Sequence, residues 1–323
     1  MVYTQHSSLM KEISSGKFIF TGELEPRKTT DISDVIEEAK ILKHNVTACN
    51  VTDNPGSCAC FSSLVASYLV QQQTGMEVVY QLRCSDRNRI ALTSDLLGAS
   101  ALGIKNVLAL TGDHTLLGDM PNAKPVFDLD STILVGMIRR MVDEGLDLNG
   151  NEILGPKPKF NIGVGANPNS NPIEPEILKI VRKIENGADF IQTQVCYDIN
   201  KTLDFLRMFK VFEIPILVGI FPMKNFGTAN YFNAHVPGVS VPPELMEAFI
   251  DVKQGGYTKT EKRERYDQIN LDFFVPFVQE LMKSKLCAGV HIMSVHYTSL
   301  IPKLIQEITG QQVTNQPIHV TSN

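Results

Sequence analysis

Eight short apolar runs, each about as long as a buried strand, alternate with longer amphipathic stretches along nearly the whole chain. In those stretches the apolar residues recur at helical spacing, so strand and helix patterns take turns. Eight such units suit a closed barrel better than an open doubly wound sheet, which needs fewer strands. The pattern therefore predicts a (β/α)8 barrel, the TIM-barrel fold. The predicted strands are Phe18–Leu24, Ala48–Val51, Val78–Leu82, Asn106–Leu110, Asn161–Ala166, Phe190–Gln194, Ile216–Ile220 and Val290–Met293.

Two segments are longer than a minimal barrel needs. Residues of about 111–130, after the fourth predicted strand, and of about 146–159 are rich in Gly, Pro, Asn and Asp, which indicates loops. The first loop follows a strand, so it lies at the face of a barrel where active sites are built. Barrels of 323 residues are common as single domains, so we expect one catalytic domain over residues 1–323.

Charge, hydropathy and cysteine usage exclude several classes of partner. The formal net charge of −5 gives no electrostatic reason to expect nucleic acid or an anionic membrane surface. The sequence has no apolar run long enough for a membrane span and no secretory signal pattern at its start. The one close cysteine pair, Cys58 and Cys60, fits no standard zinc spacing, although a redox or metal role is the less favoured alternative. We expect a cytoplasmic protein with reduced thiols and no metal site.

Polar or small residues follow every predicted strand, and a parallel barrel brings all of these strand ends to one rim. The first strand ends in Glu23 and Glu25, which strand alternation places on the same face. Asp113 follows the fourth strand, and Gln194 ends the sixth. One such ending is often only a turn or a helix cap, but eight together favour an active site.

Standard nucleotide and metal motifs do not account for this rim. Neither a P-loop nor a complete G-x-G-x-x-G follows a predicted strand. His291 and His296, near the eighth strand, lack metal-ligand spacing. A nucleotide cofactor would therefore have to lie across the loops of the barrel.

Six motifs in order resemble those of the methylenetetrahydrofolate reductase family, flavin-dependent barrel enzymes of one-carbon metabolism. The resemblance runs from about residue 18 to residue 310, and the family's (β/α)8 fold agrees with the strand count. No motif is unique, but their order and spacing make the match specific. The motifs are GELEPRKT, NVTDNPGS, LALTGD, KIENGADFIQTQVCYD, VGIFPMKNF and VHIMSVH.

This resemblance implies an oxidoreductase that reduces 5,10-methylenetetrahydrofolate to 5-methyltetrahydrofolate in a ping-pong reaction. FAD at the C-terminal face takes a hydride from NADH or NADPH and delivers it to the folate. Aligned on the proline of GELEP, Glu23 is the general acid that protonates folate N10, and Asp113 is the family's Asp near flavin and pterin. Partial burial beside a second carboxylate would raise the pKa of Glu23, as this role requires. A negative charge at Asp113 would stabilise the iminium cation formed on ring opening.

The resemblance also implies binding residues. Gln194 contacts the substrate, and Phe232 matches an aromatic that stacks on nicotinamide or folate. Arg182 and Lys183 are natural partners for the FAD pyrophosphate. The positions that match those around the flavin are Thr52, Gln81, Thr111, Gly112, Asp113, Asn167, Arg182 and Lys183.

Glu25 stands where the family often has an aromatic residue. We place it with the substrate-binding residues, and two roles stay open for it. Its carboxylate either tunes Glu23 or takes a salt bridge from Arg27 or Lys28.

Four further positions depart from the family pattern and leave alternatives open. Thr111 stands where bacterial members commonly have Arg, Gln81 where a His often contacts the flavin, Asn167 replaces a tyrosine and Thr228 a glutamine. FMN is therefore an alternative to FAD. A second reading is a flavin- and folate-binding subunit of a heteromeric reductase, with electrons from a zinc or iron–sulfur partner. A third is a pterin-binding barrel without flavin. The sequence is compatible with a homo- or hetero-oligomer and with either direction of reaction.

Overall fold

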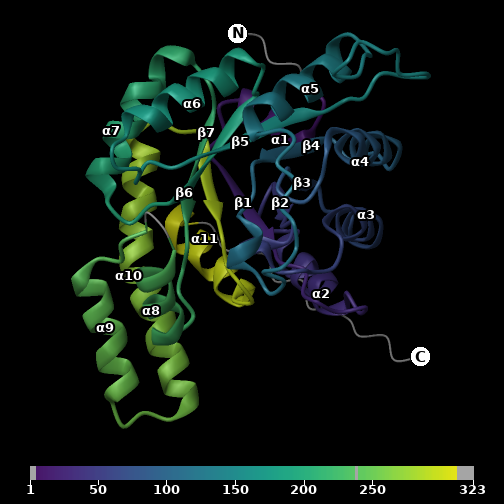
Figure 1. The fold of residues 1–323 in the computed structure, drawn as a ribbon. Helices are drawn as coiled ribbons and strands as arrows, with labels where there is room; N and C mark the ends of the chain where they lie inside the picture. Colours follow the sequence, from purple (N-terminus) through teal and green to yellow (C-terminus); the bar gives the residue numbers. More distant parts are fainter. Residues whose placement is uncertain (1–4, 237–238, 311–323) are drawn as a thin grey trace.

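The predicted barrel is confirmed: eight parallel strands pair in chain order, and the eighth returns to pair with the first (Figure 1). This structure is a computed structural model, and it describes residues 5–236 and 239–310. The strands differ from the predicted ranges by at most one residue at an end, where assignments are least sharp. They are β1 (Ile19–Leu24), β2 (Ala48–Val51), β3 (Val78–Arg83), β4 (Asn106–Leu110), β5 (Asn161–Ala166), β6 (Phe190–Val195), β7 (Ile216–Ile220) and β8 (Gly289–Ile292).

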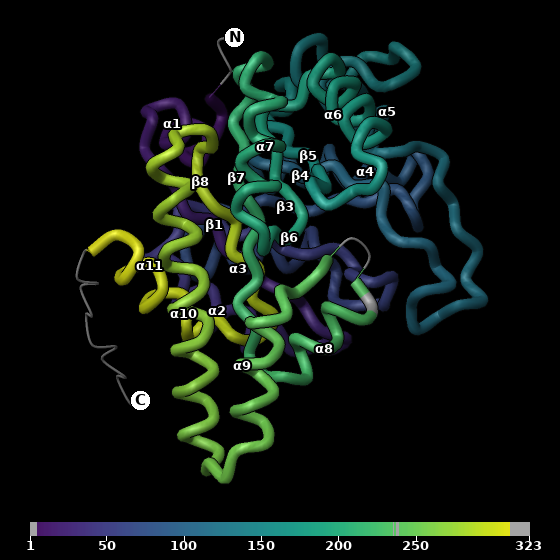
Figure 2. Tube along the Cα trace, turned by 90° about the vertical axis from the view of Figure 1, so that its left-hand side faces the viewer, coloured from purple at the N-terminus to yellow at the C-terminus, as the bar shows by residue number. Residues whose placement is uncertain are grey.

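Helices surround the barrel because their apolar stripes pack against the outer faces of the strands (Figure 1). The connecting helices are α2 (Ser33–Leu42), α3 (Ser63–Thr74), α4 (Arg89–Ala101), α5 (Ser131–Asp143), α6 (Glu174–Glu185), α7 (Ile199–Phe209), α10 (Lys259–Ser284) and α11 (Ile301–Thr309). Between β7 and α10 the chain adds α8 (Phe226–His235) and α9 (Pro243–Gln254). Figure 2 shows α9 beside the first half of the long α10, both running beyond the strand ends.

A short helix closes the N-terminal end of the barrel. In α1 (Ser8–Ser14), Leu9 and Met10 are fully buried in a cluster with barrel residues such as Phe190. The carboxylate of Glu77 accepts hydrogen bonds from the first backbone N–H groups of this helix, at 2.8 Å each. With that end filled by side chains, the cavity for ligands lies at the opposite rim.

The two predicted loops contain little regular structure. A 3-10 turn, Thr115–Leu117, is the only helical piece described between β4 and α5. The segment of about 146–159 folds back on itself through one antiparallel bridge between Leu146 and Glu152. Within the described residues, no helix combines the length and the apolar character needed to cross a membrane. All six cysteines are unbonded to one another.

Candidate active site

A cavity of about 520 Å³ lies at the C-terminal ends of the strands. Its volume is in the range of small-molecule sites. The structure brings most of the predicted site residues together here, because parallel strands end at one rim. Those that line the cavity are Glu23, Gln81, Thr111, Gly112, Asp113, Asn167, Lys183 and Gln194.

Glu23 is held between an amide and an imidazole. Its side chain is 14% exposed, Nε2 of Gln81 donates to Oε2 at 3.4 Å, and Nε2 of His291 lies 3.5 Å from the same oxygen. Nδ1 of His291 lies 3.0 Å from Oγ1 of the fully buried Thr21. These contacts fix the carboxyl of Glu23 and direct it toward the cavity.

His291 is a site residue that the sequence reasoning missed. It was considered only as a metal ligand, for which its spacing is wrong. In the barrel, β1 pairs with β8 and Thr21 is the register partner of His291. The signal that could find it was the predicted eighth strand, Val290–Met293, because a closed barrel places that strand next to the first.

A reciprocal pair of buried amides, Asn50 and Gln192, lines the cavity. Nδ2 of Asn50 donates to Oε1 of Gln192 at 2.7 Å, and Nε2 of Gln192 donates to Oδ1 of Asn50 at 3.1 Å. Gln194 lines the same cavity, and its Oε1 accepts from the backbone N–H of Val195 at 2.9 Å. This bond orients the amide of Gln194, so its NH₂ group is available to a ligand.

Asp113 lies on an exposed turn that is held by the loop after β2. The Gly56 N–H donates to Oδ2 of Asp113 at 3.1 Å, and the hydroxyl of Ser57 donates to its backbone carbonyl at 2.7 Å. The preceding Gly112 has a φ of +87°, and a Cβ there would stand 2.5 Å from Oγ of Ser85. Glycine is therefore required for the turn that presents Asp113.

One face of α6 brings charge to the cavity. Nζ of the buried Lys183 donates to the carbonyl of Gly165 at 2.7 Å, and burial together with the nearby Lys179 lowers its pKa to about 8. Oε1 of Glu176 accepts from the backbone N–H of Asn167 at 2.9 Å. Lys179 also lines the cavity and was missed, although it lies four residues before Lys183, on the same helical face.

Four predicted residues lie away from this cavity lining. Arg182 is exposed on another face of α6, and Thr52 is buried with an Oγ1 that has no described partner. Phe232, on α8, packs on Phe221 with ring centroids 3.9 Å apart. Glu25 lies just beyond the last residue of β1.

The carboxyl of Glu25 forms no salt bridge within the described part of the chain. Arg27 Nε instead donates to Nε2 of His296 at 3.0 Å and lies 3.4 Å from Oδ2 of Asp34, while Lys28 bonds to Asp119. The salt-bridge alternative for Glu25 is therefore wrong. Burial, followed by the negative charges of Glu23 and Glu38, raises the pKa of Glu25 to about 7.

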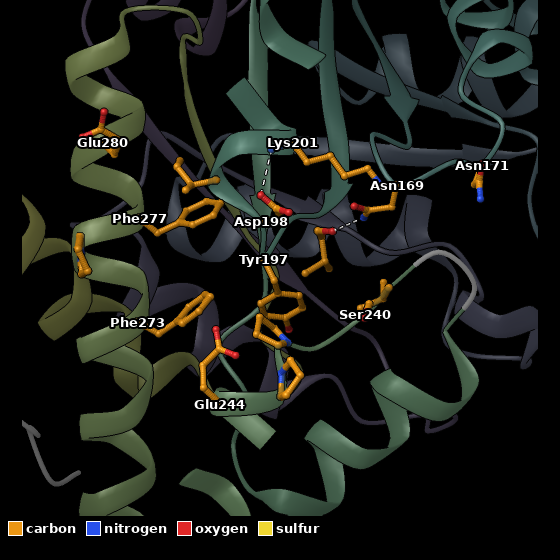
Figure 3. Close-up of a pocket in the computed structure, with 16 residues that line it drawn as sticks. Asn169, Asn171, Tyr197, Asp198, Lys201, Ser240, Glu244, Phe273, Phe277 and Glu280 are labelled. Carbon is orange, nitrogen blue, oxygen red and sulfur yellow. Dashed lines mark hydrogen bonds between the residues drawn. The ribbon is translucent and has the colours of Figure 1, made fainter. Parts of the chain in front are cut away.

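A larger cavity of about 910 Å³ lies between the loop after β6 and helices α9 and α10 (Figure 3). Tyr197, Phe273 and Phe277 give it an apolar wall, and Glu244 and Glu280 lie at its edge. None of the predicted site residues lines it. Because the carboxylates and amides converge at the barrel rim instead, we assign the chemistry to the smaller cavity.

Comparison with known proteins identifies a family. A family model described as methylenetetrahydrofolate reductase matches residues 8–309. Methylenetetrahydrofolate reductase 2 of Schizosaccharomyces pombe is 24% identical over 294 residues, which are 85% of this chain and 42% of that protein. The 5,10-methylenetetrahydrofolate reductase of Salmonella typhimurium is 24% identical over 254 residues, 76% of this chain and 77% of that one. The chain thus spans less than half of the yeast relative.

Solved structures show the same fold at low identity. A Clostridium thermocellum protein, described as binding two copies of 5-methyl-5,6,7,8-tetrahydrofolic acid, has a TM-score of 0.61 at 14% identity over 94% of this chain and 98% of that chain. EDTA monooxygenase from Chelativorans has a TM-score of 0.56 at 9% identity, over 92% and 94%. These two likenesses show the barrel alone.

The raised pKa of Glu25 predicts a pH-dependent effect on stability. The folded protein holds this proton up to about pH 7, whereas the ordinary value is 4.5, so folding loses stability as pH rises between these values. Glu25→Gln removes that loss. The variant should therefore gain on wild type between about pH 4.5 and pH 7.5, by up to about 3 kcal/mol in the free energy of unfolding.

Denaturant unfolding of both proteins at several pH values measures this difference. Glu37→Gln is the matched control, because Glu37 is exposed on α2 and pairs with Lys40. Its difference from wild type should not change over this pH window. If the difference in the free energy of unfolding between Glu25→Gln and wild type is equally independent of pH, the raised pKa of Glu25 is contradicted.

Proposed function

We propose that this chain, which belongs to the methylenetetrahydrofolate reductase family, reduces 5,10-methylenetetrahydrofolate to 5-methyltetrahydrofolate with a bound flavin. The observation that carries the proposal is Glu23, a carboxyl held by Gln81 and His291 at the mouth of the barrel. Asp113 and Gln194 line the same cavity. The Clostridium thermocellum barrel that binds a methylated tetrahydrofolate supports a pterin as substrate.

The residues of the rim fit a flavin nucleotide. Lys179 and Lys183 offer two cations on one helical face, which suits the phosphates of FAD. Gly112 leaves the backbone bare at the cavity, and the unpartnered buried hydroxyl of Thr52 is a spare donor close to the end of β2. When bound, the flavin would supply an acceptor for a hydride from the electron donor and then a source of hydride for the folate.

Glu23 supplies the proton that the folate needs. Opening the five-membered ring requires protonation at N10, and a carboxyl at the cavity wall is suited to donate it. Gln81 and His291 hold the carboxyl of Glu23 in place. The side chain therefore does not have to be reoriented before it donates its proton. The negative charge of Asp113 would then stabilise the cation left on the substrate.

Gln194 and Asn50 serve recognition rather than proton transfer. The oriented NH₂ group of Gln194 can donate to the pterin, and Asn50 is fixed by its two hydrogen bonds with Gln192. We keep Phe232 as a proposed stacking partner, which would require α8 to present its ring toward the cavity.

A heteromeric reductase is the second candidate, with electrons from a zinc or iron–sulfur partner in place of NADH or NADPH. The structure gives one observation in its favour. Thr228, at the position of a glutamine that the family resemblance implies for nicotinamide and folate, bonds to Oδ1 of Asn225 at the start of α8 and does not line the cavity. A bound nicotinamide would therefore lack the contact that the family's glutamine implies at this position.

A flavin spectrum of the purified protein tests the proposal. We expect a yellow protein that is bleached by reductant and re-oxidised by methylenetetrahydrofolate. Titration with NADH and NADPH then separates the two candidates, because steady turnover with either donor alone excludes dependence on a partner. A colourless protein that neither FAD nor FMN can reconstitute would refute a flavin-dependent reductase.

Glu23→Gln should separate the two half-reactions. Flavin reduction needs no proton from Glu23, so its rate should stay close to that of wild type. Re-oxidation by the folate should slow by about 10²–10⁴-fold, the usual contribution of general acid catalysis. Stopped-flow absorbance of the flavin measures both rates. Equal losses in the two steps would show that Glu23 has another role.

Lys179→Ala should weaken flavin binding, because it removes a cation from the cavity wall. We expect the Kd to rise by about tenfold, the equivalent of one charge-assisted hydrogen bond. Arg182→Ala is the matched control, since Arg182 is also on α6 but points away from the cavity. Fluorescence titration of flavin-free protein measures both. If Arg182→Ala raises the flavin Kd more than Lys179→Ala does, Arg182 and not Lys179 binds the pyrophosphate.

A further inference from the structure

Two amides are buried inside this barrel, where a TIM barrel usually packs branched apolar side chains. Asn50 on β2 is 0% exposed and Gln192 on β6 is 4% exposed. Because β2 and β6 lie on opposite sides of the closed barrel, the two side chains meet across its interior. Burying an amide costs free energy unless its groups find hydrogen-bond partners. Packing alone therefore does not account for this pair.

The amide pair lies between the apolar end of the barrel and the rim cavity, the one of about 520 Å³ at the strand ends. Ala48 and Phe190 come two residues before the amides on the same faces of β2 and β6. Both belong to the apolar cluster that α1 closes. Asn50 and Gln192 themselves line the rim cavity, together with Gln194. The pair is thus placed where a ligand in this cavity can reach it.

The two amides leave half of their hydrogen-bonding groups unused. A side-chain amide has two N–H donors and a carbonyl oxygen with two lone pairs. The bonds between Asn50 and Gln192 use one donor and one lone pair of each. Within residues 5–236 and 239–310, neither side chain makes a further hydrogen bond. One N–H and one lone pair of each amide remain for a ligand.

Reciprocal pairing determines how the unused groups are arranged. Since each carbonyl accepts from the other amide, the oxygen of one side chain lies beside the nitrogen of the other along both edges of the pair. Each edge therefore offers one acceptor and one N–H donor, 2.7 Å apart on one edge and 3.1 Å apart on the other. The arrangement is the same when both amides are turned over, because oxygen and nitrogen then exchange places in both.

A cyclic amide, or lactam, has the complementary edge. Its ring N–H can donate to the free lone pair of one amide, and its neighbouring C=O can accept from the free N–H of the other. Flavins and pterins both carry this group, at N3 and C4 of their rings. Such a ring would satisfy buried polar groups that otherwise have no partner, which is favourable for binding.

The space beside the pair is open on the β5 side. Gly165 is the register partner of Gln192 and lines the rim cavity. A Cβ at Gly165 would meet only Cδ2 of Leu110, at 3.6 Å. Leu110 lines the same cavity from β4. A planar ring can therefore lie over the bare backbone of Gly165 with Leu110 as an apolar contact.

We propose that Asn50 and Gln192 together bind the lactam edge of a ring in the rim cavity. The ring N–H donates to the carbonyl oxygen of one amide, and the ring C=O accepts from the N–H of the other. The pair takes no part in proton or hydride transfer. This inference rests on the proposed function, which supplies two rings of this chemistry, the flavin and the pterin.

Rings methylated at N3 test the pair, because the methyl group removes the N–H of the lactam. Flavin-free protein is titrated with riboflavin and 3-methylriboflavin, and in a second series with a tetrahydropterin and its 3-methyl derivative. In wild type we expect the Kd of a methylated ring to exceed that of its parent by about tenfold, the loss of one net hydrogen bond. The series that shows this difference identifies the ring that the pair binds.

Asn50→Leu combined with Gln192→Met removes both amides while keeping the shapes of the side chains. This double variant should keep a Tm close to that of wild type and should bind the parent and the methylated ring with equal Kd. Each single substitution should lower the Tm further, because it leaves one buried amide unpaired. Asn106→Leu is the control, since Asn106 is a buried amide at the opposite end of the barrel. It should leave the tenfold preference unchanged.

The inference is overturned if the double variant still prefers the unmethylated ring, since another group then binds the ring N–H. Equal Kd values in wild type for parent and methylated rings in both series, or no binding of either parent ring, also overturn it; these comparisons need no variant. The proposed function has its own readout, re-oxidation of the reduced flavin by methylenetetrahydrofolate. If no flavin binds and only the pterin series shows the preference, the flavin-dependent reductase fails and the inference stands.

Discussion

The pairing of β1 with β8 is the constraint on which the site depends. It closes the barrel, sets Thr21 opposite His291, and so brings an imidazole from the end of the chain to a carboxyl near its start. An open sheet with the same strands would leave Glu23 on an edge strand, without His291 beside it. Closure also fills one end of the barrel with α1 and side chains, so that polar strand ends meet at the other.

The strands could be predicted because each is a short apolar run bounded by polar turns, and burial on both faces leaves little room for another pattern. The same reasoning found the rim, since a parallel barrel puts every strand end on one side. Glu23, Asp113 and Gln194 were found in this way and do line the cavity. Their roles in catalysis came from the family resemblance and stay proposals.

The other site residues are determined by tertiary contacts, which cannot be read from a single sequence. Arg182 and Lys183 are adjacent and equally cationic, yet the rotation of α6 buries one beside the cavity and exposes the other. Lys179 shares the face of Lys183 and could have been chosen from spacing alone. Arg27 donates to His296, more than 200 residues away, and lies beside Asp34, so the pairing with Glu25 that the sequence suggested does not form.

Glu23 and Glu25 are only two residues apart, yet their surroundings differ because β1 ends between them. The last paired residue of β1 is Leu24, opposite Val51. Glu23 therefore sits within the ring of strands, where Gln81 and His291 reach its carboxyl. Glu25 lies beyond the ring, where burial and the negative charges of Glu23 and Glu38 raise its pKa. Among the residues that the structure describes, no cation forms a salt bridge with it. A carboxyl fixed by polar neighbours is suited to meet a substrate, and a buried one without a partner is suited to hold a proton.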